Sequence, residues 1–216
     1  MTEHRKLFAA GMAVTAILLI VAVATLMIIA SSNNAGSTGD GSSAWSYPDV
    51  TLEAYEAYHS LPHPQVTTED LAAIVEPNNP NPYVIDIAQQ MSSPQDVVAF
   101  LKAHIAFATD ADVYGKSDYW ASPTETLFNH RGDCDDFAIL TASILSAMGY
   151  EPEILLMSAE PTGHMAVLLD GVYLDPLAVH GQPPINADPV TSILGVKILS
   201  NGEIKQRLVE KTEIFS

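Results

Sequence analysis

The sequence has one cysteine, few basic residues and no N-x-Ser/Thr sequon. Because Cys134 is the only cysteine among 216 residues, a disulfide within the chain is excluded and the thiol needs another explanation. Lys and Arg number 9 against 26 Asp and Glu, which gives a net charge of −17. This acidic excess argues against nucleic acid or anionic lipid headgroups as partners. No period of about 20 to 50 residues suggests a repeat architecture.

A long uncharged segment, residues 7–30, dominates the N-terminal part of the chain. As a helix it would extend about 36 Å, more than the ~30 Å hydrocarbon core of a bilayer. We expect it to be a transmembrane anchor; a cleavable signal peptide is the alternative, although the apolar region of such peptides is usually about 7 to 15 residues long. Basic residues precede the span and none follows until Lys102, which predicts a cytoplasmic segment 1–6 and an extracytoplasmic remainder at the cell membrane.

Two further regions follow the expected anchor. Residues 31–48 are rich in Ser, Gly and Asn, a composition typical of a flexible linker. Residues 49–216 are sufficient for one domain with a hydrophobic core.

A cysteine lies at the start of a strongly apolar helix. Asp133 is suited to the N-cap, Asp135 and Asp136 fall in the first turn, and Gly149 is a natural stop. The helix is apolar on almost every side, so it should be buried. Cys134 is therefore placed at the N-terminus of a central helix, as a nucleophile would be.

The alternative for Cys134 is a small buried core residue, because free cysteines are often buried. The helix dipole favours the thiolate. The flanking aspartates disfavour a second negative charge, so the dipole alone is insufficient and a histidine partner is required for nucleophilic chemistry.

Helices are expected in the first half of the domain and strands in the second. Capping patterns and apolar spacing predict helices over 68–75, 83–91, 94–107 and 123–129, with loop or short strand over 109–120. Apolar runs predict strands over 154–157, 165–169 and 172–174 and a further hairpin from 193–199 and 203–209. This order indicates an α+β fold in which the central helix packs on an antiparallel sheet, preceded by one transmembrane helix.

The turn Asp170-Gly171 predicts which residues share a face of the sheet. If it is a two-residue turn, Ala166 lies opposite Asp175. Because side chains alternate along a strand, His164 and Asp175 then project to the same side as diagonal neighbours. Thiol, imidazole and carboxylate together would form a triad, with Cys134 as nucleophile, His164 as base and Asp175 as the residue that orients the imidazole. A bulge in either strand would remove this parity.

The same residues resemble the transglutaminase-like superfamily of papain-type cysteine enzymes. The residues that carry the resemblance are Ser122-Pro123 with Glu125 and Leu127, Gly132 to Asp136, Ala138 to Leu145 with Met148 to Tyr150, Gly163-His164 and Tyr173 to Pro176. The resemblance implies a papain-like fold and the same three roles for Cys134, His164 and Asp175. It also makes Trp120 a candidate for the oxyanion site or the cleft wall, with a core position as the alternative. The family commonly has Ala-Trp after the histidine, where this chain has Met165-Ala166.

These features favour a membrane-anchored thiol enzyme that acts on amide bonds of peptide or cell-wall material, as a peptidase or amidase. Acyl transfer to an amine is a close variant, and a non-catalytic binding or structural module on the same fold is the main alternative. No cofactor or metal is expected. The sequence has no EF-hand-like ligand run, and a zinc site from His130, Cys134 and nearby aspartates is weak because structural zinc prefers several Cys or His ligands.

Overall fold

The computed structural model describes residues 45–60, 67–75, 81–159, 163–175, 178 and 187–215. The expected anchor 7–30 and most of the expected linker 31–48 lie outside the described residues. In the part of the chain that is described, none of the helices has the length and apolar character needed to cross a membrane.

Short capped helices precede the sheet, as the sequence indicates. They are α2 (Leu52–His59), α3 (Thr68–Val75), α4 (Pro82–Ala88), α5 (Pro94–His104), α6 (Asp110–Val113), α7 (Pro123–Asn129) and α8 (Cys134–Ala147), with α9 (Lys211–Ile214) near the C-terminus. Helices α5 and α7 both begin with a serine N-cap, a proline and an acidic capping box, which satisfies the free N–H groups of their first turns. These caps explain why both helices start where the sequence predicts.

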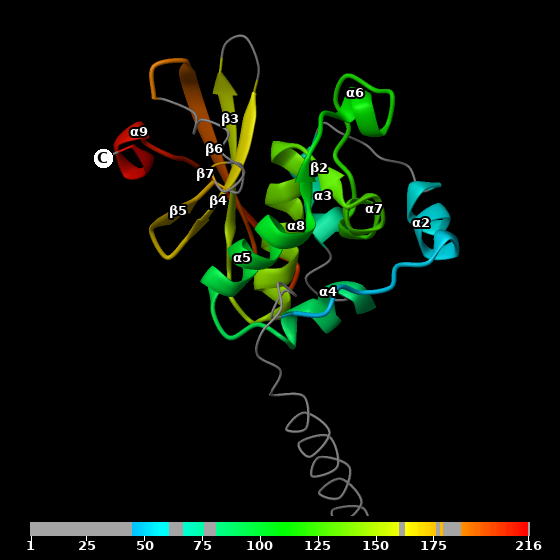
Figure 1. The fold of residues 1–216 in the computed structure, drawn as a ribbon. Coiled ribbons are helices and arrows are strands. Elements are labelled where there is room, and N and C mark those ends of the chain that lie inside the picture. The colour runs from blue at the N-terminus through cyan, green and yellow to red at the C-terminus, as the bar shows by residue number, and fades with distance from the viewer. Residues whose placement is uncertain are drawn as a thin grey trace, which may run out of the picture. The chain divides into compact units, whose positions relative to one another are not determined.

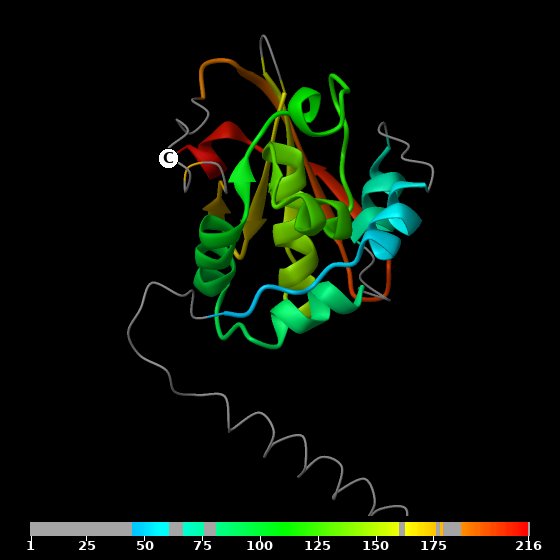
Figure 2. The same ribbon diagram turned by 45° about the vertical axis from the view of Figure 1, so that its right-hand side comes forward.

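Helix α8 is the centre of the helical layer. Its residues from Asp135 to Leu145 are all buried. Helices α3, α4, α5 and α7 pack around it, and strands β3 and β4 lie against its remaining side, an arrangement visible in Figures 1 and 2. An almost wholly apolar helix is stable only when surrounded in this way, since exposure of its surface to water would be unfavourable.

The second half of the chain forms an antiparallel sheet with strand order β5-β4-β3-β6-β7. Its strands are β3 (Glu153–Ala159), β4 (His164–Leu169), β5 (Val172–Leu174), β6 (Val190–Ile198) and β7 (Ile204–Leu208). The predicted mixed α+β class with an antiparallel sheet is confirmed.

Each face of the sheet belongs to a different hydrophobic cluster. Met165, Val167 and Leu169 of β4 join the main cluster around α8. Ala166 and Leu168 join a smaller cluster, to which Phe215 adds from the C-terminal end. The alternation shows that β4 is buried on both faces and that α8 covers the face of the odd-numbered residues.

Two segments differ from the sequence prediction. Helix α5 ends at His104, and the next residues form β1 (Ala106–Phe107), which pairs in parallel with β2 (Arg131–Gly132). Apolar spacing could not predict this end, because the partner strand is distant in the sequence. The segment expected to be loop or short strand contains helix α6, which Thr109 caps through the Asp112 N–H.

Gly132 is expected to tolerate no side chain. A Cβ atom there would lie 2.4 Å from the Oδ2 atom of Asp136. Asp136 is fully buried and accepts hydrogen bonds from the N–H groups of Ala121 and Asp133, so it has little freedom to move. Gly132→Ala should lower the free energy of unfolding by about 1 to 3 kcal/mol, measured by chemical denaturation.

The matched control for this variant is Gly163→Ala. The nearest atom to a Cβ at position 163 is the Met157 carbonyl oxygen at 3.4 Å, which is ordinary contact. Equal stability of the two alanine variants would contradict the proposed crowding at Gly132.

Candidate active site

The β4–β5 hairpin has the turn and register that the sequence predicts. Asp170 and Gly171 both have positive φ, 49° and 80°, as a two-residue turn of this kind requires. Leu169 pairs with Val172 and Leu168 with Tyr173. No bulge shifts this register. The prediction that His164 and Asp175 project to the same side of the sheet therefore holds.

An imidazole and a carboxylate meet at the open end of this hairpin. His164 Nε2 lies 3.1 Å from Asp175 Oδ2, and the two side chains are only 10% and 3% exposed. The Tyr173 hydroxyl donates to the same carboxylate oxygen at 3.1 Å. Two donors therefore fix the Asp175 carboxylate, and its bond to Nε2 leaves Nδ1 of His164 as the ring nitrogen that can take up a proton.

The thiol reaches β4 at the edge of the strand. Cys134 is the first residue of α8, and its sulfur accepts a hydrogen bond from the backbone N–H of Met165, the residue after His164. In a hairpin with a two-residue turn, the odd-numbered residues of β4 point their N–H groups toward β5. Among the described residues the β5 ladder ends at Leu174, and the Met165 N–H, two residues further along β4, bonds to the thiol.

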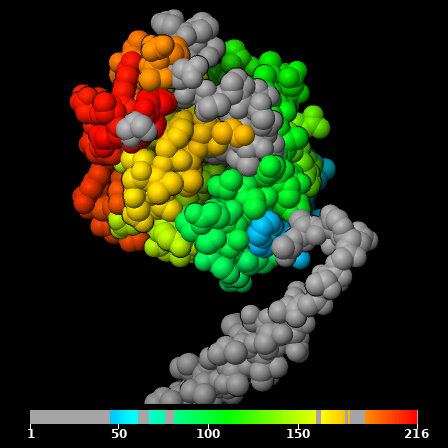
Figure 3. Space-filling view, turned by 60° about the vertical axis from the view of Figure 1, so that its left-hand side comes forward, coloured from blue at the N-terminus to red at the C-terminus, as the bar shows by residue number. Residues whose placement is uncertain are grey.

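The structure thus places Cys134, His164 and Asp175 around one end of the β4–β5 hairpin. Figure 3 shows this hairpin in gold on one face of the molecule, between green α5 and the red C-terminal segment. Trp120, the cleft or oxyanion candidate, is partly buried against the main hydrophobic cluster. It precedes Ala121, whose N–H donates to Asp136 in the first turn of α8.

Tyr173 is the member of this group that sequence reasoning did not assign to the site. Burial and the charge of Asp175 hold the pKa of Tyr173 well above its usual range, and ionisation of Cys134 would act in the same direction. The hydroxyl therefore lies close enough to interact with both groups. The hairpin register already places Tyr173 on the face of His164, but register alone does not show that the hydroxyl bonds to Asp175.

The electrostatic environment keeps the thiol protonated. Burial raises the pKa of Cys134 well above its ordinary value, the charges of Asp135 and Asp133 raise it further, and the Met165 N–H opposes them only in part. The helix dipole favours the thiolate, but burial and the aspartates outweigh it, so the neutral thiol is the more stable form. Nucleophilic chemistry at this sulfur requires a base.

Four carboxylates converge behind the thiol. Oxygen atoms of Asp110, Asp133, Asp135 and Asp136 all lie within 4.8 Å of one another. Burial and the charge of Asp133 raise the pKa of Asp110 to about 7, and burial with the charge of Asp136 raises that of Asp135. Such mutual repulsion favours protonation or a bound cation.

This cluster is more than a helix cap. Asp136 does cap α8, because it accepts the Asp133 N–H. One oxygen each of Asp110, Asp133 and Asp135 is nevertheless buried without a hydrogen-bond partner among the described residues. Unpartnered carboxylate oxygens are the ligands that a hard cation such as Ca²⁺ prefers. Sequence reasoning missed Asp110, which only the fold brings to the start of α8.

The metal-binding groups found among the described residues give no support to the zinc alternative. A second group comprises Asp133, Cys134 and Asp135. His130 belongs to neither group, and carboxylates dominate both.

Ca²⁺ is expected to stabilise this protein through the four carboxylates. At a concentration about one hundred times the Kd, the free energy of unfolding should rise by about 2.7 kcal/mol, detected as an increase in Tm. Asp110→Asn should raise Tm without the cation, because it relieves repulsion, and should weaken the response to Ca²⁺.

The control for the cation prediction is Asp86→Asn, which removes an exposed carboxylate on α4. It should respond to Ca²⁺ as the unmodified protein does. An undiminished response in Asp110→Asn would show that the cation acts elsewhere.

The comparison with known proteins agrees with the geometry of the site. A family model for bacterial transglutaminase-like cysteine proteinases matches residues 74–169, less than half of the chain but including Cys134 and His164. The curated proteins contain no match.

Two solved structures show distant similarity. LapG of Legionella pneumophila is 19% identical over 64% of this chain and 80% of its own length, with a TM-score of 0.36. A candidate cysteine protease of Cytophaga hutchinsonii is 11% identical over 75% of this chain and 58% of its own, with a TM-score of 0.34. These scores are too low to support an argument about substrate or partner. The family match supports a thiol peptidase and agrees with the resemblance drawn from the sequence: over residues 74–169 the chain is similar to the bacterial transglutaminase-like cysteine proteinases.

Proposed function

We propose that the protein is a membrane-anchored, extracytoplasmic thiol enzyme that cleaves amide bonds of peptide or cell-wall substrates. Cys134 is the nucleophile, His164 the base and Asp175 the residue that orients the imidazole. The observation that carries this proposal is the His164–Asp175 hydrogen bond of 3.1 Å beside a thiol that contacts the next residue of the same strand.

The hydrogen bonds assign a role to each nitrogen of His164. Nε2 is held by Asp175, so Nδ1 takes the proton from the thiol as the sulfur attacks the carbonyl carbon of the amide. The carbonyl oxygen becomes an oxyanion, and N–H groups at the start of α8 are suited to stabilise it. Trp120 remains a candidate for a second contact there or for the cleft wall.

The second half of the reaction reverses the proton transfer. Protonated His164 gives its proton to the nitrogen of the leaving amine, the C–N bond breaks and a thioester to Cys134 remains. Water, deprotonated by His164, attacks the thioester and releases the acid and the thiol. An amine in place of water would give acyl transfer by the same steps.

The neutral resting thiol is consistent with this sequence of steps. Because Asp133 and Asp135 disfavour a free thiolate, charge develops on the sulfur only as the proton moves to His164. The Asp175 carboxylate, held also by Tyr173, then stabilises the imidazolium.

Membrane attachment forms the remaining part of the proposal. Residues 7–30 would hold the enzyme at the cell membrane with the domain outside, where peptide and cell-wall amides are accessible. A binding or structural module would need no such trio of ionisable groups, so the arrangement favours catalysis.

Alkylation by iodoacetamide should report the coupling between thiol and imidazole. We expect His164→Ala to slow labelling of Cys134 at neutral pH by about a hundredfold, roughly the lower end of the contribution of a positioned base. The rate should rise with pH in both forms, because the thiolate is the reactive species. His130→Ala, an exposed histidine outside the trio, is the matched control, and equal rates in all forms would contradict the role of His164.

Turnover itself is tested with the full-length protein in detergent. Incubation with peptide libraries and cell-wall fragments should give new amines and acids, and Cys134→Ala should give none above background. Formation of the same products at the same rate by Cys134→Ala would remove the enzyme proposal.

A further inference from the structure

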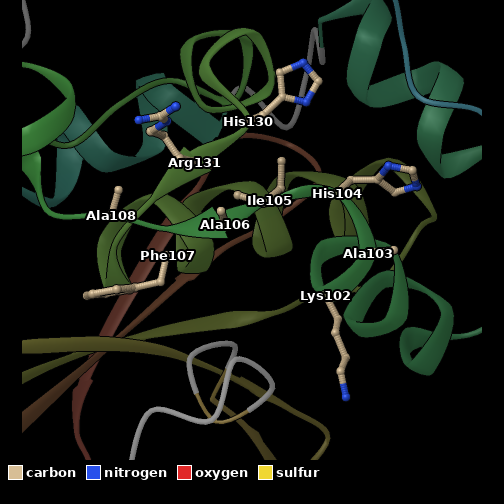
Figure 4. Close-up of a pocket in the computed structure, with 9 residues that line it drawn as sticks. All are labelled: Lys102, Ala103, His104, Ile105, Ala106, Phe107, Ala108, His130 and Arg131. Carbon is tan, nitrogen blue, oxygen red and sulfur yellow. The ribbon is translucent and has the colours of Figure 1, made fainter.

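A hollow along β1 is unused by the mechanism above. It encloses about 560 Å³ and is lined by residues 102–108 together with His130 and Arg131. Seven consecutive residues of its lining are β1 and the residues that flank it, so the hollow follows the course of that strand (Figure 4).

One edge of β1 is open. The N–H groups of Ala106 and Ala108 donate to the carbonyl groups of His130 and Gly132 at 2.8 and 2.9 Å. In a parallel pair of strands, the N–H and carbonyl groups of Phe107 between them must point away from β2. Within the described ranges these two groups have no hydrogen-bond partner. An open edge of this kind can accept an extended peptide as an added strand.

The open edge lies close to the proposed nucleophile. Phe107 is paired with Gly132, which stands two residues before Cys134. A peptide added to the open edge would therefore run alongside β1, with the segment that leads into Cys134 on the other side of that strand. Phe107, 38% exposed, offers such a peptide an apolar contact.

The hollow is lined by two cations whose charges are not used elsewhere. Lys197 and Arg207 on the large sheet form ion pairs with glutamates. Lys102 and Arg131 are exposed and have no ion pair among the residues that the structure describes. They are notable in a protein with a net charge of −17, which repels acidic ligands from most of its surface.

The two cations extend to opposite sides of β1, as Figure 4 shows. Arg131 is paired with Ala106, whose small side chain leaves space above the strand. Because side chains alternate along a strand, successive residues of an added peptide would face Lys102 and Arg131 in turn. Carboxylates at such positions complement both cations.

We propose that the open edge of β1 binds an extended polypeptide segment with acidic side chains. The segment adds to β1 through the N–H and carbonyl groups of Phe107, and its carboxylates face Lys102 and Arg131. This inference rests on the proposed function, since it makes the segment the part of the substrate that leads the scissile amide to Cys134.

Binding is measured apart from turnover in the full-length Cys134→Ala protein. The probes are a fluorescein-labelled octapeptide with the repeat Glu-Glu-Val-Val, which places carboxylates on both faces of an extended strand, its Gln isostere and its Lys analogue. By fluorescence anisotropy at low salt, the Glu peptide should bind most tightly. Replacing both Lys102 and Arg131 by Gln should weaken its binding by roughly two- to thirtyfold, the expected loss of two exposed ion pairs, to the level of the Gln isostere.

The matched control is Lys205→Gln. Lys205 is an exposed lysine of β7, at the far edge of the sheet, and it has no ion pair among the described residues. Its replacement should leave the Kd within twofold. Two further Glu peptides carry N-methyl groups on either the odd-numbered or the even-numbered amides, so that each is blocked along one of its edges. One of the two should lose binding, because it cannot pair with the edge of β1.

Two results would overturn the docking proposal. They are equal affinity for the three peptides, and an unchanged Kd in the Lys102 and Arg131 double variant. Either result combined with rapid His164-dependent labelling of Cys134 would remove the docking site and leave the thiol enzyme intact. Selective binding without turnover by the unmodified protein would retain the docking site and remove the proposed catalysis.

Discussion

The contact between the first turn of α8 and the edge of β4 is the interaction on which the candidate site depends. Helix α8 is buried along its length, so its position is set by packing on all sides and not by its own polar groups. That packing carries the Cys134 sulfur to the Met165 N–H. The β4–β5 hairpin independently holds His164 against Asp175. The proposed chemistry exists only because these two rigid units meet.

Negative charge around the thiol is the second constraint. Four aspartates converge near the start of α8, and their mutual repulsion raises the pKa of Asp110 and Asp135. The same field disfavours a thiolate at Cys134. A cation held by the carboxylates would reduce both effects, so cation binding, fold stability and thiol reactivity are physically linked in this arrangement. The cations at the proposed peptide site lie outside this cluster, Lys102 at the end of α5 and Arg131 on β2.

Local rules predicted much of the site. The Asp170-Gly171 turn fixed the register of β4 and β5, and Asp133 marked the start of α8, because turn geometry and helix capping involve residues close in sequence. The positions of His164, Tyr173 and Asp175 on one face followed from that register. No pattern of neighbouring residues indicated that α8 packs on the face of β4 opposite to His164. Because of that packing, the thiol meets β4 at the edge of the strand.

The amino-acid sequence by itself determined the capped starts of α5, α7 and α8, the hairpin register and the residue types of the proposed trio, since each depends on neighbours within a few positions. The tertiary structure alone decided the pairing of β1 with β2, the approach of Asp110 to the α8 carboxylates and the contact of Cys134 with Met165. These contacts join segments about 20 to 30 residues apart in the chain. They form because burying α8 and the strand faces outweighs the entropy lost on closing the intervening loops, and no local pattern records that balance.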